Sequence, residues 1–238
     1  MNLSRAQLSD YVNSLNEISA QAQKTFSDEL WSVYNATGKD IDTLHDAINM
    51  LAPSIADRYG AVASTISADL WEKIYKADTG LSADAVIDTM DTSHLFGASS
   101  GYAFRDGKST DAKVAIAHVA GTMGRAVRNH ARATMRSNTD RYGGRYARVP
   151  TGDKTCAFCL MLASRGFIYL SEDSAGEFDQ YHDDCDCEVV ASFDTDNSAI
   201  EGYSPDEYYK MYRDARAEAG SKDTNDILSK MREMYGLS

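Results

Sequence analysis

Apolar residues recur at steps of three and four along the N-terminal part of the chain. This spacing places them on one face of an α-helix, and it predicts a helix from Ser4 to about Ala36. Gly38 follows as a helix-terminating glycine, and Asp40 or Asp42 can cap the next helix. The apolar face of the first helix comprises Leu8, Tyr11, Val12, Leu15, Ile18, Phe26, Leu30 and Val33.

The next helical pattern contains Pro53, which predicts a break or kink between two helical runs, the second ending at Gly80. Residues 83–90 are expected to form a short helix, and the glycine- and serine-rich run 97–101 a loop. A long helix is predicted over 111–138, with the arginines mainly opposite its apolar face. That face comprises Val114, Ile116, Val119, Ala120, Met123, Val127, Ala131 and Met135.

The pattern changes at Tyr142, after which short strands are predicted at 146–150, 166–170 and 187–193, with one or two helical turns at 157–164. Helices return after Asn197. The predicted fold class is therefore α+β, in three parts. A mostly helical body spans residues 1–141, a small α+β module spans 142–195, and a C-terminal helical segment spans 196–238.

Composition and charge exclude some classes of protein. No apolar stretch reaches the roughly 18 residues that a membrane span needs. The start of the chain lacks the apolar run of a signal peptide, so we expect a cytosolic protein without membrane contact. The formal net charge of −12 argues against non-specific DNA binding by the whole chain.

The charges are unevenly distributed. Seven arginines lie between Arg125 and Arg148, with Asp140 as the single acid, whereas residues 172–188 carry eight acids and no Lys or Arg. The preferred interpretation is that these groups neutralise each other within the fold. The alternative is a basic patch that contacts DNA or an acidic partner. The arginines are Arg125, Arg128, Arg132, Arg136, Arg141, Arg145 and Arg148.

All four cysteines fall within 32 residues. Clustered cysteines in a cytosolic protein indicate metal or redox chemistry. Cys156 and Cys159 form C-x2-C, and His182, Cys185 and Cys187 form H-x2-C-x-C, which are donors suited to tetrahedral Zn²⁺. Zinc needs four of these five candidates. The predicted ligands are Cys156, Cys159, His182 and one of Cys185 and Cys187, with Cys185 favoured by its spacing from the histidine.

Other uses of these residues fit less well. A thioredoxin-like site needs a βαβ unit, a zinc deaminase needs H-x-E before P-C-x-x-C, and a metalloprotease needs H-E-x-x-H; none of these patterns occurs. Two disulfides would leave His182 unexplained. His45, His94, His118 and His130 have no carboxylate or nucleophile at a telling spacing. We therefore expect a closed, structural zinc site and no enzyme activity.

The motifs over Arg148–Gly152, Thr155–Cys159, Ala163–Gly166 and Tyr181–Cys187 resemble MuF-like minor head proteins of tailed bacteriophages, particularly phages of actinobacteria. The resemblance covers residues 142–193 by motif and residues 4–138 by helical character. It implies a minor capsid or head morphogenesis protein that associates with the portal inside the prohead. Scaffold and major capsid protein are further implied partners, and the virion and the host cytoplasm during assembly are the implied locations.

Two other functions stay open from the sequence. One is a zinc-containing nuclease or toxin-like effector that approaches nucleic acid through the Arg125–Arg148 face. Steep weakening of DNA binding by salt would be its signature. The other is a protein-interaction adaptor encoded by a bacterial host.

Overall fold

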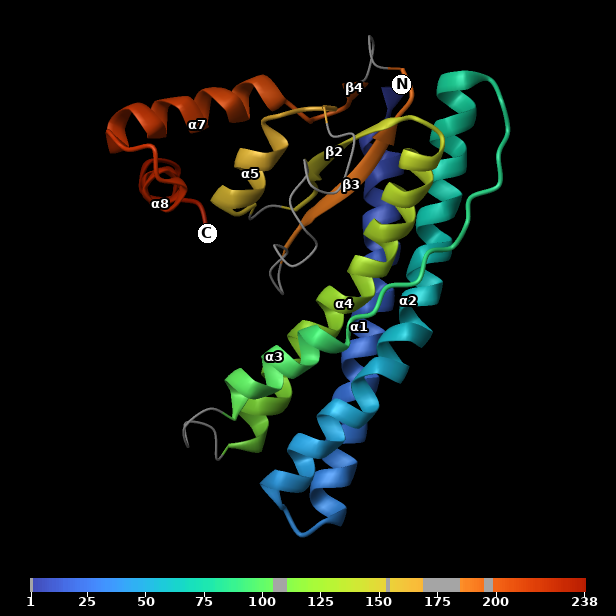
Figure 1. The fold of residues 1–238 in the computed structure, drawn as a ribbon, viewed down its shortest axis with the longest axis vertical. Helices are drawn as coiled ribbons and strands as arrows, with labels where there is room; N and C mark the ends of the chain where they lie inside the picture. Colours follow the sequence, from blue (N-terminus) through green and yellow to red (C-terminus); the bar gives the residue numbers. More distant parts are fainter. Residues whose placement is uncertain (1, 105–110, 153–154, 169–184, 195–198) are drawn as a thin grey trace.

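Long helices dominate the computed structural model, which describes residues 2–104, 111–152, 155–168, 185–194 and 199–238. Helices α1 (Arg5–Ala36), α2 (Ile41–Thr79) and α4 (Ala112–Arg141) pack along one another and form the helical body (Figure 1). The shorter α3 (Ser93–Ala103) packs against α4 and α2. None of the described helices combines the length and hydrophobicity that a membrane span requires.

The ends of the long helices follow the predicted capping residues. Ser4 and Gln7 form a capping box at the start of α1. The side chain of Asp40, not Asp42, caps α2 and accepts from the Thr43 N–H at 2.8 Å. Gly80 ends α2 in the left-handed conformation, with φ of 73°. The helix start at Ser4, the cap at Asp40 and the helix end at Gly80 are confirmed, and the capping box of Ser4 and Gln7 is added by the structure.

Of the break or kink predicted at Pro53, the break is wrong, because α2 continues through this residue, and the kink stays a prediction. A proline inside a helix removes one backbone hydrogen bond and costs about 3 kcal/mol. The residues on either side of Pro53 are anchored in the core. Ile48 and Ala52 precede it and Ala56 follows it, all fully buried. Burial of this apolar face offsets the local cost and keeps one helix.

The predictions for residues 83–90 and 97–101 are also wrong. Residues 81–92 are not helical, and backbone groups of this segment bond to side chains of the long helices. The Asn138 amide pairs with both the N–H and the carbonyl of Val86 at 2.8 Å, and Thr134 Oγ1 accepts from the Asp88 N–H at 3.2 Å. The expected loop lies instead within α3, whose small residues allow close packing on α4.

A two-stranded antiparallel sheet lies beside one end of the helical body (Figure 1). It consists of β2 (Arg145–Pro150) and β3 (Cys187–Ser192), as predicted, with Arg145 opposite Ser192 and Pro150 opposite Cys187. Between them in sequence lies α5 (Ala157–Ala163). The strand expected at 166–170 is absent from residues 166–168, and its last two residues lie outside the described part.

The C-terminal helices pack on α5. Helices α7 (Pro205–Ala219) and α8 (Thr224–Tyr235) bury Ala215, Ile227 and Met231 against this short helix. Near the other terminus, β1 (Asn2–Leu3) pairs in parallel with β4 (Ala199–Ile200).

One large hydrophobic core continues from the helical body into the sheet. It includes Leu15 and Val127 from the helices and Val149 and Val190 from the strands, all fully buried. The core therefore crosses residue 141, where the sequence places the end of a helical domain. The division into three parts stays a prediction. The fold class, α+β with a predominantly helical bulk, is confirmed.

Candidate metal centre

Three cysteine sulfurs meet between α5 and the start of β3. Cys159 Sγ lies 3.2 Å from Cys185 Sγ and 3.0 Å from Cys187 Sγ, and the last two are 3.3 Å apart. All three residues are buried, and we call them the cysteine triad. Within the described part of the chain, the sulfur atoms of the cysteine triad form a group of three ligand atoms that lie close enough together to bind one metal ion.

Pairing of the strands brings distant parts of the sequence to this point. The register places Cys187 opposite Pro150, just before the segment that leads to α5. The Thr151 N–H donates to the Asp186 carbonyl at 3.2 Å, and Thr155 Oγ1 donates to the Asp186 carboxylate at 3.1 Å. These bonds fix the turn containing Cys185 and Cys187 against the residues that precede α5.

Cys156 occupies a different position from the triad. It is the N-cap of α5, where its sulfur accepts from the Cys159 N–H at 3.4 Å, and it is only partly buried. Its sulfur also hydrogen-bonds with the Cys159 thiol, which is the main reason that the pKa of Cys159 is raised. Cys156 therefore lies beside the triad as a possible fourth sulfur ligand.

The triad favours one thiolate even without an ion. Hydrogen bonds from Cys159 and then Cys187 lower the pKa of Cys185, and the Arg132 guanidinium contributes in the same direction. Hydrogen bonds with Cys156 and the other triad thiols, together with burial, raise the pKa of Cys159. The raised pKa favours the protonated thiol at Cys159, and the lowered pKa favours the thiolate at Cys185. The thiolate is the form that binds metals.

The spacing of the sulfurs tests whether zinc fits. Bonds of about 2.3 Å in tetrahedral geometry require sulfurs about 3.8 Å apart. The observed 3.0–3.3 Å is well beyond a disulfide bond of about 2.05 Å, and the pairs would have to open by about 0.5 to 0.8 Å to hold the ion. Small side-chain rotations achieve this, so the residues present fit a zinc ion.

A buried ion network supports β3 from the other side. Arg132 and Glu188 are almost fully buried, and Arg132 Nε lies 3.2 Å from Glu188 Oε2. Arg128 also pairs with Glu188, and it bonds to Asn16 of α1. Arg132 Nη2 donates to the Cys187 carbonyl at 2.8 Å. The same guanidinium therefore ties α4 to the backbone of the cysteine triad.

The arginine-rich stretch is partly buried, with two of its seven arginines buried and four half-buried. Arg132 and Arg148 are 1% exposed, and of the seven arginines, all within the described residues, only Arg141 is classed as exposed. The expectation that they lie on the solvent face of the helix is therefore wrong for Arg132. Pairing of Arg128 and Arg132 with Glu188 agrees with neutralisation within the fold. Little of the stretch is available for a phosphate backbone.

The structure brings together three of the five predicted ligands and places a fourth, Cys156, beside them. The sequence favoured Cys185 over Cys187, but both sulfurs reach Cys159. The structure thus places both cysteines at the triad and does not choose between them. His182 lies outside the described residues, and its role stays a prediction. Sequence reasoning missed Glu188 and Arg132, whose pairing over 56 residues has no local signal.

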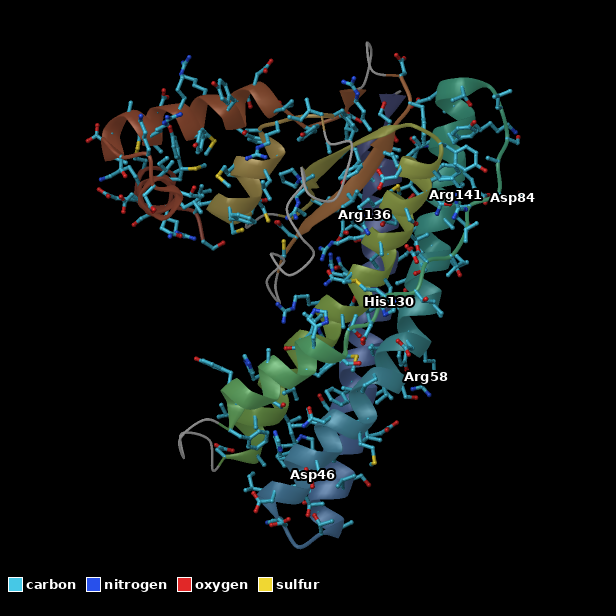
Figure 2. The ribbon with its side chains drawn as sticks, in the orientation of Figure 1. Asp46, Arg58, Asp84, His130, Arg136 and Arg141 are labelled. Atoms are coloured by element: carbon cyan, nitrogen blue, oxygen red, sulfur yellow. The ribbon has the colours of Figure 1, made fainter. Side chains whose placement is uncertain are left out.

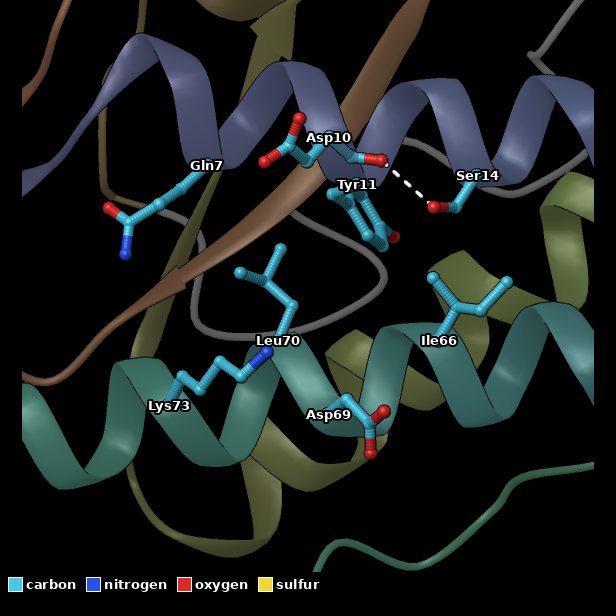
Figure 3. A pocket seen from close by; sticks show the side chains of 8 residues that line it. All are labelled: Gln7, Asp10, Tyr11, Ser14, Ile66, Asp69, Leu70 and Lys73. Carbon is cyan, nitrogen blue, oxygen red and sulfur yellow. Dashed lines mark hydrogen bonds between the residues drawn. The ribbon is translucent and has the colours of Figure 1, made fainter.

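A cavity of about 410 Å³ lies between α1 and α2 (Figure 3). Burial raises the pKa of Tyr11, which keeps the phenol protonated, and Ser14 Oγ donates to the Asp10 backbone carbonyl at 2.9 Å. Asp10 and Asp69 add carboxylates, and Lys73 an ammonium group. Among the described residues that line this cavity, no histidine or cysteine is present to form an activated nucleophile pair.

Comparison with known proteins adds relatives from bacteriophages. The chain is similar to the Gene 15 protein of Mycobacterium phage D29, with 38% identity over 22% of this chain and 29% of the relative. It is also similar to the Gene 15 protein of Mycobacterium phage L5, with 34% identity over 22% of this chain and 30% of the relative. The matched part thus spans less than a third of these relatives.

No solved structure matches the chain significantly. The family model described as VG15 protein matches residues 2–215, which include the helical body, the sheet, the cysteine triad and most of α7. Because this match covers far more than half of the sequence, the chain belongs to the VG15 protein family of bacteriophages.

Proposed function

We propose that the cysteine triad holds a structural Zn²⁺ ion, with Cys156 or His182 as the fourth ligand. The observation that carries this proposal is the convergence of Cys159, Cys185 and Cys187 on one buried point, with sulfurs 3.0–3.3 Å apart. Burial and a full set of protein ligands leave no open coordination position for a substrate, which favours a structural over a catalytic role.

Zinc would link two segments that are far apart in sequence. Cys156 and Cys159 lie at the start of α5, whereas Cys185 and Cys187 lie at the start of β3. A sheet of two strands has little stability by itself in water. Metal binding supplies folding free energy at this junction, because the ligands are assembled only in the folded state.

Metal analysis of the full chain tests this role. Protein purified under reducing conditions should contain one zinc ion per chain, as measured by elemental mass spectrometry. Cys159→Ser, Cys185→Ser and Cys187→Ser should each lose it. Comparison of Cys156→Ser with His182→Ala identifies the fourth ligand, because only the variant that removes this ligand should lower the zinc affinity strongly. Absence of metal from the reduced wild-type protein would overturn the proposal.

We further propose that the protein is a minor capsid or head morphogenesis protein that associates with the portal inside the prohead, without enzyme activity. The motif resemblance to MuF-like proteins supports this role, and the mycobacteriophage relatives support a phage origin. Residence in the virion follows from the same role. In mechanism, the zinc-stabilised sheet and the long helices form a rigid body that presents a docking surface to the portal.

Co-assembly tests the head role. The chain should co-purify with proheads that contain the portal of the same phage, and cross-linking should join it to the portal. Proheads assembled without portal should retain much less of it. Equal retention in both preparations, or none in either, would contradict the assignment. The alternative of a nuclease or toxin-like effector is not favoured, because two of the arginines that it would use are buried and Arg128 and Arg132 pair with Glu188.

A further inference from the structure

A second cavity, of about 440 Å³, lies between α2, α4 and the segment that connects α2 to α3. Asp57 comes from α2, His130 from α4, and Asp88 and Asp91 from the connecting segment. Figure 2 labels His130 within the helical body, away from the sheet. None of the described residues that line this cavity is Lys or Arg, so its ionisable groups are carboxylates and one imidazole.

Two buried polar side chains in this cavity lack a hydrogen-bond partner among the described residues. One is His130, at Nε2, and the other is Thr92, at Oγ1; each residue is 2% exposed. Most buried polar atoms in proteins are hydrogen-bonded, because an unsatisfied one costs about 1–3 kcal/mol. Two such atoms facing one cavity indicate an occupant that satisfies them.

The position of the imidazole is fixed by close packing. A Cβ atom built on Gly60 would lie 2.4 Å from His130 Cδ2, so only glycine at this position lets the ring lie against α2. The ring then places Nε2 3.9 Å from Asp57 Oδ1. This distance is too long for a hydrogen bond. It is about half an ångström longer than the roughly 3.4 Å between two atoms bonded at about 2.1 Å to one tetrahedral ion, so the exposed Asp57 side chain must rotate slightly toward His130 to share the ion.

The charge of the cavity favours a cation. Burial lowers the pKa of His130, although Asp57 and Asp88 act in the opposite direction. The unprotonated nitrogen of an imidazole offers a lone pair to a metal. The Asp57 side chain is 68% exposed, which leaves a path from solvent. Asp88 and Asp91 do not lie close enough to His130 and Asp57 to form a group of three ligand atoms with them, but they add negative charge to the cavity.

We propose that this cavity is a second metal site, in which His130 Nε2 and the Asp57 carboxylate bind one divalent transition-metal ion such as Zn²⁺. Imidazole together with carboxylate suits these ions. Water completes the coordination and can bond to Thr92 Oγ1. The site differs from the cysteine triad in its ligands, its place in the fold and its openness to solvent, so it does not depend on the zinc proposed there.

Zinc titration of the full chain tests the proposal. The protein is first saturated with Zn²⁺ and desalted, so that the cysteine triad is filled, and further Zn²⁺ uptake is measured by calorimetry. The wild type should bind one more ion per chain. Asp57→Asn should weaken this binding at least tenfold, and His130→Ala should abolish it. Because Asp57 is exposed, its variant tests the site even if removal of the buried histidine impairs folding.

An exposed pair on the same helix provides matched controls. His45 Nδ1 lies 4.0 Å from Asp46 Oδ1, and these side chains are 42% and 89% exposed. His45→Ala and Asp46→Asn should bind the further ion like the wild type. The proposal is wrong if the wild type takes up no further Zn²⁺, or if Asp57→Asn and His130→Ala bind it as tightly as the controls.

Discussion

The helical body and the sheet beside it share one hydrophobic core, but different interactions stabilise the two regions. In the helical body, apolar side chains such as Leu15, Phe26 and Ile48 are fully buried between α1, α2 and α4. In the sheet, β3 also buries Glu188, Cys187 and Ser192, and its charged group is neutralised by arginines of α4. The helical body is stabilised mainly by the burial of apolar surface, and the sheet by particular polar and sulfur contacts.

This difference predicts different responses to substitution. Apolar packing is spread over many contacts, so loss of one side chain costs a few kcal/mol and leaves the rest in place. Polar contacts, and the metal contacts proposed for the cysteine triad, are concentrated in few atoms, and loss of one leaves its partners unsatisfied in the interior. The four predictions below test this contrast, from the largest expected effect to the smallest.

Cys159→Ser should have the largest effect. Structural zinc sites contribute on the order of 10 kcal/mol to folding, so loss of one thiolate should lower the free energy of unfolding by at least about 5 kcal/mol. Urea denaturation with parallel zinc analysis measures this. Leu162→Ala on the same helix is the control: it should lose stability through packing but keep its zinc. A Cys159→Ser protein as stable as the wild type would contradict the contrast.

Arg132→Met should cost about 4 kcal/mol, because it leaves Glu188 buried with Arg128 as its remaining charged partner among the described residues. The same denaturation experiment measures the loss. Arg141→Met, at an exposed position of α4, should change stability little. Adding Glu188→Leu to Arg132→Met should recover part of the loss, since no unpaired acid then remains. A further loss in the double variant would show that the charge is not the cause.

Leu15→Ala in the helical body should cost about 3 kcal/mol, because it creates a cavity in the core between the helices. Zinc content of the folded protein should stay at the wild-type value, as the substitution touches none of the ligands. Loss of zinc from the folded variant would mean that the helical body and the cysteine triad are more tightly coupled than this contrast allows.

Ser4→Ala should have the smallest effect, about 1 kcal/mol, through loss of the capping box at the start of α1. Thermal unfolding followed by circular dichroism should show a small decrease in midpoint, with zinc content unchanged. Ser14→Ala is a suitable control, because this half-buried serine donates to the Asp10 carbonyl within the same helix and does not cap it. A larger loss than that of Leu15→Ala would reverse the proposed order.

The sequence by itself determined the long helices and the metal motif. Helical periodicity and capping residues such as Ser4, Asp40 and Gly80 are local signals, because a helix forms its hydrogen bonds within a few residues. The clustering of cysteines in the sequence likewise predicted a site, and three of them, Cys159, Cys185 and Cys187, meet in the structure.

Tertiary structure alone decided the features that depend on distant partners. Packing on both sides carries α2 through Pro53, and Asn138 and Thr134 of α4 bind residues 86–88, which locally favour a helix. Pairing of Glu188 with Arg132, and the approach of His130 to Asp57, likewise join residues far apart in sequence. Periodicity shows which face of a helix or strand is buried, but it does not identify the residues that pack against that face. The contacts above depend on those residues.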